Sequence, residues 1–408
     1  MAMAKPSILF INRVYAPEKG ATGRMLHDLA LGFVNDGWSV GVLTTGPKEI
    51  EGEFEGVQLR KLKASPKQSL FNYITIWLRL LKAVWGAKKV DIIVTMTDPP
   101  MISIIGRLIA KKNKIAHIHW CQDRYPDLLP VLDVKCPSYL LRRLKSLSEW
   151  SLKTCARIIV IGECMARRIG TPDIDPRRVT FIPNWPDREL HAAQENQFHP
   201  SPLMKKGLKL DKPLVVNHEP KFRVLYAGNI GRAHPIDTIL EAAALLQLSN
   251  PEIEFLFVGE GEGFDRLAEA RQRRNLENIR LLPTQPKFRL REMMQGGDLH
   301  LISMKKEAAG LLVPSKIYSA LAAERPTVFI GPEDCEIANI LGKYGAGSVI
   351  GQDEAGALAQ EILAYRMDGS KWFNAHKGAR KGFEAFNADN AIQSWIACAR
   401  TLIRYPAS

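Results

Sequence analysis

Residues 226–235, Tyr-Ala-Gly-Asn-Ile-Gly-Arg-Ala-His-Pro, have the types and spacing of an anion-binding loop. They follow an apolar run at 222–225 and precede a helical pattern at 236–246. In a strand–loop–helix unit of this kind, backbone N–H groups converge at the helix N-terminus, where the helix dipole favours negative charge. The pattern predicts a phosphate or diphosphate site in the second half of the chain, although two glycines at this spacing also occur in ordinary tight turns.

A second anion site is predicted at Pro314-Ser315-Lys316, where a helix is expected to begin. The hydroxyl of Ser315 can cap that helix, and Lys316 can reach an anion held over its N-terminus. We expect the three residues to bind the same diphosphate as the glycine loop. The alternative is a plain capped helix.

A carboxylate follows an expected strand in the segment His-Ile-His-Trp-Cys-Gln-Asp, which ends at Asp123. Asp123 could orient or deprotonate a hydroxyl group, a general-base role that requires hydrogen-bond reach. The alternative is a structural cap of the following turn. His119 lies beside a tryptophan and is interpreted as a core residue. A D-x-D pattern at Asp173 and Asp175 lies in a proline-bounded turn, so we do not interpret it as a metal site.

Length and composition indicate a two-domain globular protein of 408 residues. Six cysteines without a C-x-x-C pair fit reduced thiols in the cytoplasm. The chain runs directly into a strand pattern, so no signal peptide is expected, and no apolar run reaches the ~20 residues that cross a bilayer. We expect a cytoplasmic protein that is peripheral at the inner face of the cell membrane.

The net charge of +13 favours an anionic partner: nucleic acid, a phospholipid surface or a phosphate-bearing small molecule. No nucleic-acid motif is legible, so nucleic acid ranks last and is not expected as a partner. Residues 58–90 contain eight Lys or Arg and no acid. The apolar helix expected at 70–85 could pack in a domain or lie on an anionic membrane. The residues predicted to contact the membrane are Lys61, Lys63, Lys67, Trp77, Lys82 and Trp85.

Apolar runs alternate with helical patterns along most of the chain, which predicts an α/β fold with parallel sheets. The first series of strands is expected at 7–12, 39–44, 57–62, 91–95, 114–118, 156–161 and 179–182. The second series is expected at 222–226, 255–258, 279–282, 299–303, 327–330 and 348–350. The pattern stops between about 188 and 220, a stretch with several prolines and little periodicity.

Two Rossmann-like, doubly wound domains that face each other across a cleft would explain this organisation. The expected divisions are a first domain at 1–190, a linker at 191–220, a second domain at 221–385 and a C-terminal helical segment at 386–408.

The ordered motifs resemble the GT-B glycosyltransferases of family 4, which are retaining nucleotide-sugar transferases. The resemblance rests on I-L-F-I-N-R-V-Y-A-P-E-K-G-A-T-G-R-M near the start, I-V-I-G-E-C-M at 159–165, F-I-P-N-W-P-D at 181–187, F-L-F-V-G-E-G-E at 255–262 and P-S-K-I-Y-S-A-L-A-A-E-R-P at 314–326. It covers nearly the whole chain. Y-x-G-N-x-G-R-x-H and P-S-K-x-Y resemble a subgroup that works in bacterial polysaccharide or O-antigen assembly.

The resemblance implies transfer of a sugar from a nucleotide-diphosphate donor, a UDP-sugar being expected, to a membrane-associated, lipid-linked carbohydrate acceptor. It implies no cofactor and no obligatory metal. It also implies that the domain at 1–190 binds the acceptor, that the domain at 221–385 binds the nucleotide sugar, and that a C-terminal helix at 386–408 packs back towards the first domain. Asn229 and His234 stand where the wider family has its phosphate-binding arginine and lysine. Arg232 is the candidate substitute, since its fork suits phosphate; the alternative is a solvated loop residue.

Glu307 resembles the glutamate that binds the donor sugar in this family, whereas Ser319 aligns with the glutamate that binds ribose. The residues expected to act on the leaving group, sugar or acceptor are thus Asp123, Arg232, Glu307 and Lys316. The residues expected to bind the donor are Gly20, Ala21, Thr22, Gly23, Gly228, Asn229, Gly231, His234, Gly259, Pro314, Ser315 and Ser319. Two alternatives are a non-catalytic nucleotide-sugar-binding paralogue that serves in assembly, and a nucleotide-sugar epimerase of the same fold.

Overall fold

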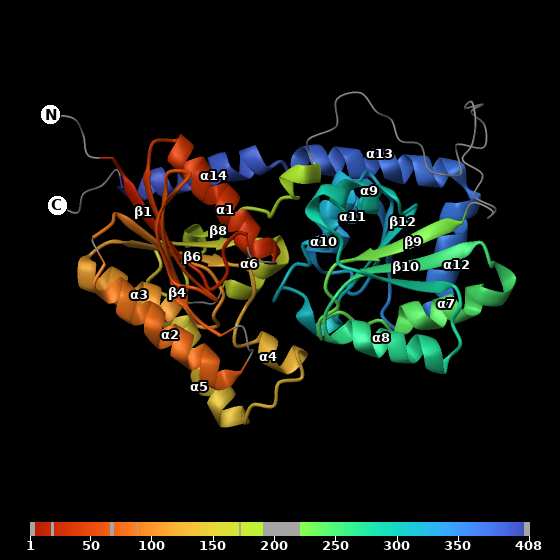
Figure 1. Cartoon of the computed structure of the whole chain (residues 1–408), viewed down its shortest axis with the longest axis horizontal. Helices are drawn as coiled ribbons and strands as arrows, with labels where there is room; N and C mark the ends of the chain where they lie inside the picture. Colours follow the sequence, from red (N-terminus) through yellow and green to blue (C-terminus); the bar gives the residue numbers. More distant parts are fainter. Residues whose placement is uncertain are drawn as a thin grey trace. The chain divides into compact units, whose positions relative to one another are not determined.

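A largely parallel sheet of eight strands and a parallel sheet of six organise the chain in the computed structural model (Figure 1). The structure describes residues 5–17, 20–65, 69–87, 89–170, 173–190 and 221–403. Each sheet is the centre of one compact unit. The first unit comprises residues 1–185, 310–313 and 387–408, and the second comprises 186–309 and 314–386.

The first sheet has the strand order β3-β4-β2-β1-β5-β6-β7-β8. Its strands are β1 (Ser7–Ile11), β2 (Ser39–Gly46), β3 (Ile50–Phe54), β4 (Val57–Lys63), β5 (Ile92–Thr95), β6 (Ala116–Cys121), β7 (Arg157–Val160) and β8 (Val179–Phe181). All pairs are parallel except β3 with β4. The strand order reverses direction between β1 and β5, and ligands of such sheets bind beyond the carboxyl ends of the strands at that point.

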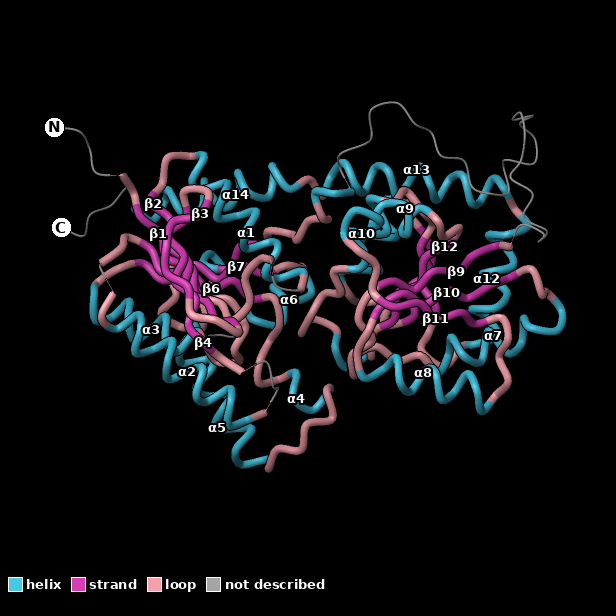
Figure 2. The backbone as a smooth tube through the Cα atoms, in the orientation of Figure 1, coloured by secondary structure: helices cyan, strands magenta, loops and turns pink. Residues whose placement is uncertain are grey.

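The helices of the first unit cover both faces of its sheet (Figure 2). They are α1 (Ala21–Asn35), α2 (Leu70–Trp85), α3 (Ser103–Asn113), α4 (Leu128–Val131), α5 (Ser138–Leu152), α6 (Glu163–Ile169) and α14 (Ala388–Ile403). On one face α1 packs against α14, and the Trp395 ring lies 4.9 Å from that of Trp120 on β6. On the other face α2 and α3 share a core with the sheet, in which Ile76 and Leu80 are fully buried.

The second sheet has the order β11-β10-β9-β12-β13-β14 and is entirely parallel. Its strands are β9 (Phe222–Ala227), β10 (Ile253–Gly259), β11 (Ile279–Pro283), β12 (Leu299–Ser303), β13 (Thr327–Ile330) and β14 (Gly347–Ile350). Its helices are α7 (Asp237–Ser249), α8 (Glu262–Arg273), α9 (Leu290–Gln295), α10 (Lys316–Ala322), α11 (Glu336–Tyr344), α12 (Ala355–Met367) and α13 (Gly369–Ala385). Here the order reverses between β9 and β12, so these two strands define the expected ligand-binding edge.

The alternation of strands and helices agrees with the sequence-based expectation, and the helix at 70–85 and the strands at 299–303 and 327–330 have the predicted bounds. The antiparallel strand β3 was not predicted. It is an edge strand with no buried residue, and hence it lacks the apolar signal of a core strand. Glu55 and Gly56, with φ of 52° and 79°, form the two-residue turn that joins it to β4.

A short segment of the β12–α10 connection belongs to the first unit rather than the second. The N–H of Arg124 donates to the carbonyl of Leu311 at 2.7 Å, and Asp123 forms a β-bridge with Leu312. Gly310 has a φ of 70°, and a Cβ there would lie 2.9 Å from the carbonyl oxygen of Cys164. Only glycine fits this position without a shift of the neighbouring backbone.

Candidate functional site

The loop after β9 is packed tightly against the loop after β10. Gly228 has a φ of 107°, and a Cβ on Gly259 would lie 2.4 Å from the carbonyl oxygen of Gly228. Both positions therefore require glycine, one for backbone conformation and one for close approach. A Cβ on Gly231, in contrast, would meet only the edge of the His234 ring at 4.0 Å.

Lys316, the first residue of α10, extends under the glycine loop. Its Nζ donates to the main-chain carbonyl of Asn229 at 2.9 Å and lies 5.4 Å from the centre of the Tyr226 ring. A Cβ on Gly228 would lie 3.3 Å from Cε of Lys316. Burial lowers the pKa of the Lys316 ammonium to about 8. The sequence-predicted glycine loop and lysine thus lie together at the carboxyl edge of β9, beside the point where the strand order reverses.

The predicted helix cap at Ser315 is wrong. Ser315 has helical backbone angles, φ −64° and ψ −12°, and its side chain makes no capping hydrogen bond. A capping serine needs an extended backbone so that its hydroxyl can turn back to the N–H groups of the first turn. Pro314 is buried next to it.

His234 is held as a neutral imidazole. Its Nδ1 lies 2.7 Å from the carbonyl oxygen of Ser303 at the end of β12, and a carbonyl can only accept, so Nδ1 carries the proton. Burial, with a smaller contribution from Lys316, lowers the pKa of His234 to about 3. The second ring nitrogen is consequently an acceptor. His234 cannot replace a phosphate-binding cation, but it can accept a hydrogen bond from a hydroxyl group.

Arg232 lies at the surface of the same loop. Its side chain is 46% exposed and pairs with Glu262 of α8, with Nε 3.0 Å from Oε2 and Nη2 3.1 Å from Oε1. An exposed pair of this kind contributes little stability. Arg232 could therefore exchange this carboxylate for a phosphate, which its fork also fits.

Glu307 lies in the β12–α10 connection, and Ser319 lies on α10 itself. Glu307 is exposed in a short 3-10 helix, Lys306–Ala308. The main-chain N–H of Lys305 donates to the carbonyl oxygen of Ala233 at 2.9 Å, and this hydrogen bond holds the β12–α10 connection against the glycine loop. Ser319 is partly buried and follows Lys316 by three positions on α10, so the two side chains share one helix face.

In the first unit, Asp123 lies beyond the carboxyl end of β6 with the pKa of its carboxyl raised. Burial, with a further contribution from the charge of Asp98, raises that pKa to about 6. Among the described residues, no side chain donates a hydrogen bond to the Asp123 carboxylate. A small cavity of about 20 Å³ adjoins it, lined in part by Thr97, Met101 and Tyr125. A carboxyl group in this state can exchange a proton near neutral pH.

An ion pair that sequence reasoning missed lies at the point where the strand order of the first sheet reverses. Nε of Arg13, after β1, is 2.7 Å from Oδ1 of Asp98, after β5. The N–H of Arg13 donates to the carbonyl of Asp98 at 2.6 Å, and its guanidinium lies 5.6 Å from the centre of the Tyr73 ring. The only sequence signal was that a polar residue follows each of two buried strands that are far apart in the chain.

His119 is a core residue, as predicted. Its Nδ1 lies 3.1 Å from the hydroxyl of Thr95, which also contacts Nε2 of His117 at 2.8 Å. Burial lowers the pKa of His119 to about 4.

The glycine-rich segment Gly20 to Gly23, with Ala21 and Thr22, forms the start of α1. Gly20 is the N-cap with a φ of 131°, and a Cβ on Gly23 would lie 3.3 Å from the backbone of Tyr15. Residues 18 and 19 of the same loop lie outside the described residues.

The predicted membrane residues differ in their exposure. Lys63, Lys82 and Trp85 are exposed. Lys61 is only 5% exposed, so it cannot reach lipid headgroups, and that prediction was wrong. Trp77 is partly buried against the α2–α3 core, and Lys67 lies outside the described residues.

Helix α5 adds exposed apolar side chains that sequence reasoning missed. Only Ser151 and Leu152 of its residues are buried. Among the described residues, more than half of the large apolar side chains that are exposed lie on α2 and α5. They are Leu70, Phe71, Ile74, Leu78, Trp85, Tyr139, Leu140, Leu147 and Trp150. In the described part of the chain, no helix is long and apolar enough to cross a membrane.

Comparisons with known proteins agree over most of the chain. The model of a glycosyl transferase 4-like domain matches residues 20–185, and the model of the glycosyl transferases group 1 matches residues 211–381. WbjE of Pseudomonas aeruginosa, assigned as a glycosyltransferase, is 26% identical over 72% of this chain and 71% of its own length. WcaI of Escherichia coli strain K12, assigned as a glycosyl transferase of colanic acid biosynthesis, is 28% identical over 53% of this chain and 51% of its own length.

A solved structure shares the fold of the whole chain. Anabaena HepE, in complex with UDP-glucose, superposes with a TM-score of 0.69 and 16% identity, over 97% of this chain and 100% of HepE. At this identity the likeness concerns the fold.

Proposed function

We propose that this protein transfers a sugar from a UDP-sugar to a lipid-linked carbohydrate acceptor in surface polysaccharide biosynthesis. The chain belongs to the GT-B glycosyltransferases that join a glycosyl transferase 4-like domain to a group 1 domain. The observation that carries the donor part is Lys316 beneath the glycine loop. The assignment of WcaI to colanic acid biosynthesis and the UDP-glucose complex of HepE support the choice of pathway class and base.

In this proposal the second unit binds the donor. The diphosphate lies over the loop 228–231 and the start of α10, where Lys316 neutralises the charge that develops as the sugar–phosphate bond breaks. Arg232 leaves Glu262 and adds a second cation. His234 accepts a hydrogen bond from a hydroxyl of the sugar, and Glu307 binds the same sugar. Ser319 is the candidate partner of the ribose.

The acceptor part rests on the first unit. Asp123 holds the acceptor hydroxyl and takes its proton as the new glycosidic bond forms. Asp98, which is paired with Arg13, raises the proton affinity of this carboxylate through its charge. We propose that the anomeric configuration of the donor is retained and that the reaction needs no metal ion.

The exposed face of α2 and α5 supports the membrane part of the proposal. Its apolar side chains would enter the headgroup region, and Lys63, Lys82, Arg142 and Arg143 would face anionic lipids.

Incubation with a panel of nucleotide sugars tests the function. Slow release of UDP from one UDP-sugar, accelerated by a lipid-linked acceptor, is the expected result, and the anomeric configuration of the product gives the stereochemistry. Turnover should persist in EDTA. Tight binding without any release of UDP would favour a non-catalytic nucleotide-sugar-binding protein, and an isomerised donor would favour an epimerase.

A further inference from the structure

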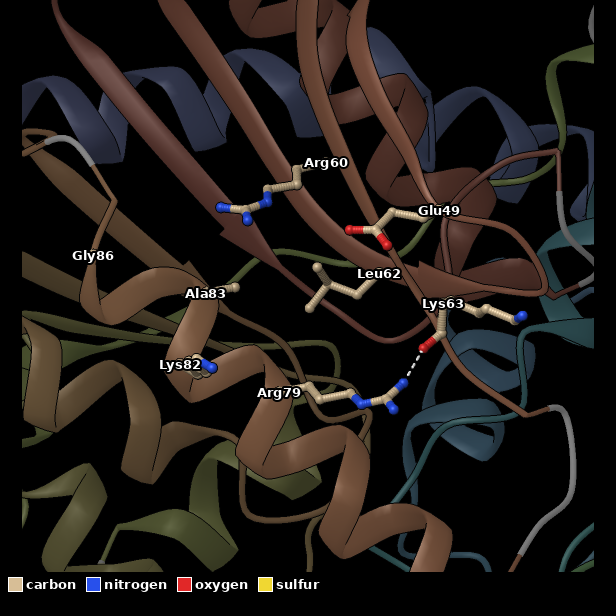
Figure 3. Close-up of a pocket in the computed structure, with 8 residues that line it drawn as sticks. All are labelled: Glu49, Arg60, Leu62, Lys63, Arg79, Lys82, Ala83 and Gly86. Atoms are coloured by element: carbon tan, nitrogen blue, oxygen red, sulfur yellow. Dashed lines mark hydrogen bonds between the residues drawn. The ribbon is translucent and has the colours of Figure 1, made fainter.

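A cationic pocket lies in the first unit, beside β4 and the C-terminal half of α2. It has a volume of about 530 Å³ and is lined by Glu49, Arg60, Leu62, Lys63, Arg79, Lys82, Ala83 and Gly86 (Figure 3). None of the residues proposed to bind the donor or the acceptor lines it.

The pocket is lined by cationic side chains and has an apolar wall. Arg60 reaches it from β4, and Arg79 and Lys82 reach it from α2, whereas Leu62 and Ala83 form apolar wall (Figure 3). Glu49 is the single acid in the lining, so the pocket carries a net positive charge. Cations that converge from two elements on one open space favour an anion with several oxygens, such as a phosphate.

Two of these cations are available to a ligand. Within the described part of the chain, neither Arg79 nor Lys82 forms an ion pair with a carboxylate. Arg79 is oriented by a hydrogen bond from Nη1 to the main-chain carbonyl of Lys63, drawn as a dashed line in Figure 3. This bond uses one of its five donors, so the remaining donors can bind a phosphate. Arg60 has a partner, Glu51, at 3.8 Å in an exposed pair that contributes little.

An exposed apolar stripe begins at the pocket. Lys82 follows Leu78 by four positions and precedes Trp85 by three, so these side chains lie on one face of α2. The stripe continues to Ile74 and Phe71, whose side chains are 50% and 80% exposed. Lys112 of α3 adds a cation at the same end of the stripe as the pocket, 4.4 Å from the centre of the Trp85 ring. Exposed aromatic and aliphatic side chains beside a cationic pocket match a molecule with a phosphate head and an apolar tail.

We propose that this pocket binds the phosphate or diphosphate group of a membrane amphiphile whose hydrocarbon part lies along the α2 stripe. The inference rests on the proposed membrane docking and narrows it from general attraction of anionic lipid to recognition of a phosphate group. Attraction of the protein to an anionic membrane would depend only on the surface charge of the membrane. A pocket that binds phosphate would also distinguish a lipid with a terminal phosphate group from a phosphodiester lipid at equal surface charge.

A titration with a soluble lipid tests the pocket without a membrane. Dihexanoyl phosphatidate, below its critical micelle concentration, should bind the full chain by calorimetry, and dihexanoyl phosphatidylcholine and inorganic phosphate should bind at least ~10-fold more weakly. Loss of the charge-assisted hydrogen bonds in R79Q/K82Q should weaken phosphatidate binding by about tenfold or more. K82Q alone, at an exposed position, should show a smaller effect in the same direction.

Two matched variants separate the pocket from other cations. R271Q/R273Q removes the same charge from exposed positions of α8 and should leave phosphatidate affinity within about twofold. K316Q tests whether the lipid occupies the donor loop instead, and it should also bind normally. The pocket proposal is overturned if R79Q/K82Q binds as the parent chain does, if K316Q alone loses binding, or if inorganic phosphate binds as tightly as phosphatidate.

Vesicles then distinguish this proposal from the membrane docking on which it rests. Two kinds of phosphatidylcholine vesicle are compared, one containing phosphatidate and the other containing phosphatidylglycerol, at equal surface charge. The parent chain should bind the phosphatidate vesicles more tightly. R79Q/K82Q should still bind both kinds but should lose this preference. If the parent chain binds both kinds of vesicle equally, the phosphate-pocket proposal is contradicted but membrane docking is not. No binding to either vesicle contradicts membrane docking, while the soluble titration still decides the pocket.

Discussion

The ammonium of Lys316 donates to the carbonyl of Asn229 at 2.9 Å, so a helix start and a glycine loop that are 87 positions apart form one structure. The carbonyl oxygen of Asn229 accepts a hydrogen bond from the ammonium group that is proposed to bind the diphosphate. A diphosphate at the loop would take this hydrogen-bond donor or share it, and it would compensate the burial that now lowers the pKa of Lys316.

Substitution of Lys316 by glutamine should weaken UDP binding and slow transfer. A hydrogen bond to a charged group contributes about 1.5–3 kcal/mol, so we expect a loss of roughly 10- to 150-fold. Thermal-shift titration with UDP and initial rates with the active donor measure the two effects. K306Q removes an exposed lysine in the neighbouring connection and should behave like the parent chain. Equal losses in both variants would contradict a specific role for Lys316.

Binding of UDP should weaken as the pH rises above about 8. The pKa of Lys316 in the free protein is about 8, so the ammonium is charged below that pH and neutral above it. The bound diphosphate favours the charged form, and the apparent dissociation constant should therefore rise up to about tenfold per pH unit. In K316R the cation stays charged, and this pH dependence should vanish. A parent chain whose affinity is constant from pH 7 to 9 would contradict the assignment.

Substitution of Asp123 by asparagine should remove transfer to the acceptor but leave UDP binding intact. In the parent chain, kcat/KM should fall as the pH drops through about 6, because the general base must be unprotonated and burial raises its pKa to that value. D98N removes the charge that contributes to the rise, so its pH profile should shift to lower pH. A profile that does not move in D98N would show that another group titrates.

Salt and apolar contacts should both control membrane association. Exposed cations near an anionic surface contribute about 1 kcal/mol each, so K63E/K82E should lower flotation with anionic vesicles several-fold, and added salt should do the same to the parent chain. F71S/L78S should lower flotation at every salt concentration. K61E is no test of docking, because Lys61 is buried. Unchanged flotation in both double variants would contradict the α2 surface.

Removal of the Trp395 side chain should destabilise the first unit. This residue is fully buried and contacts Trp120 at 4.9 Å between ring centres. Truncation of a buried tryptophan to alanine costs about 3–5 kcal/mol. W395A should therefore lower the melting temperature by several degrees, and W395F should lose less. L402A, near the end of the same helix and only partly buried, is the control.

The sequence by itself determined the alternation of strands and helices, because burial on both faces of a parallel sheet demands continuous apolar runs that are visible in the residue order. It also indicated the glycines at 228 and 259 and the lysine at 316, whose types follow from local backbone geometry and charge. The pairing of β3 was not predictable in the same way, since an exposed edge strand has no such run.

Only the tertiary structure decided which side chains meet. Arg13 and Asp98 are 85 positions apart and are brought together by strand order, which apolar periodicity does not encode. The same holds for the neutral state of His234, which depends on the carbonyl of Ser303, and for the pairing of Arg232 with Glu262. The pKa and the burial of a side chain depend on residues that surround it in space but are distant in the chain. These neighbours are set by the fold.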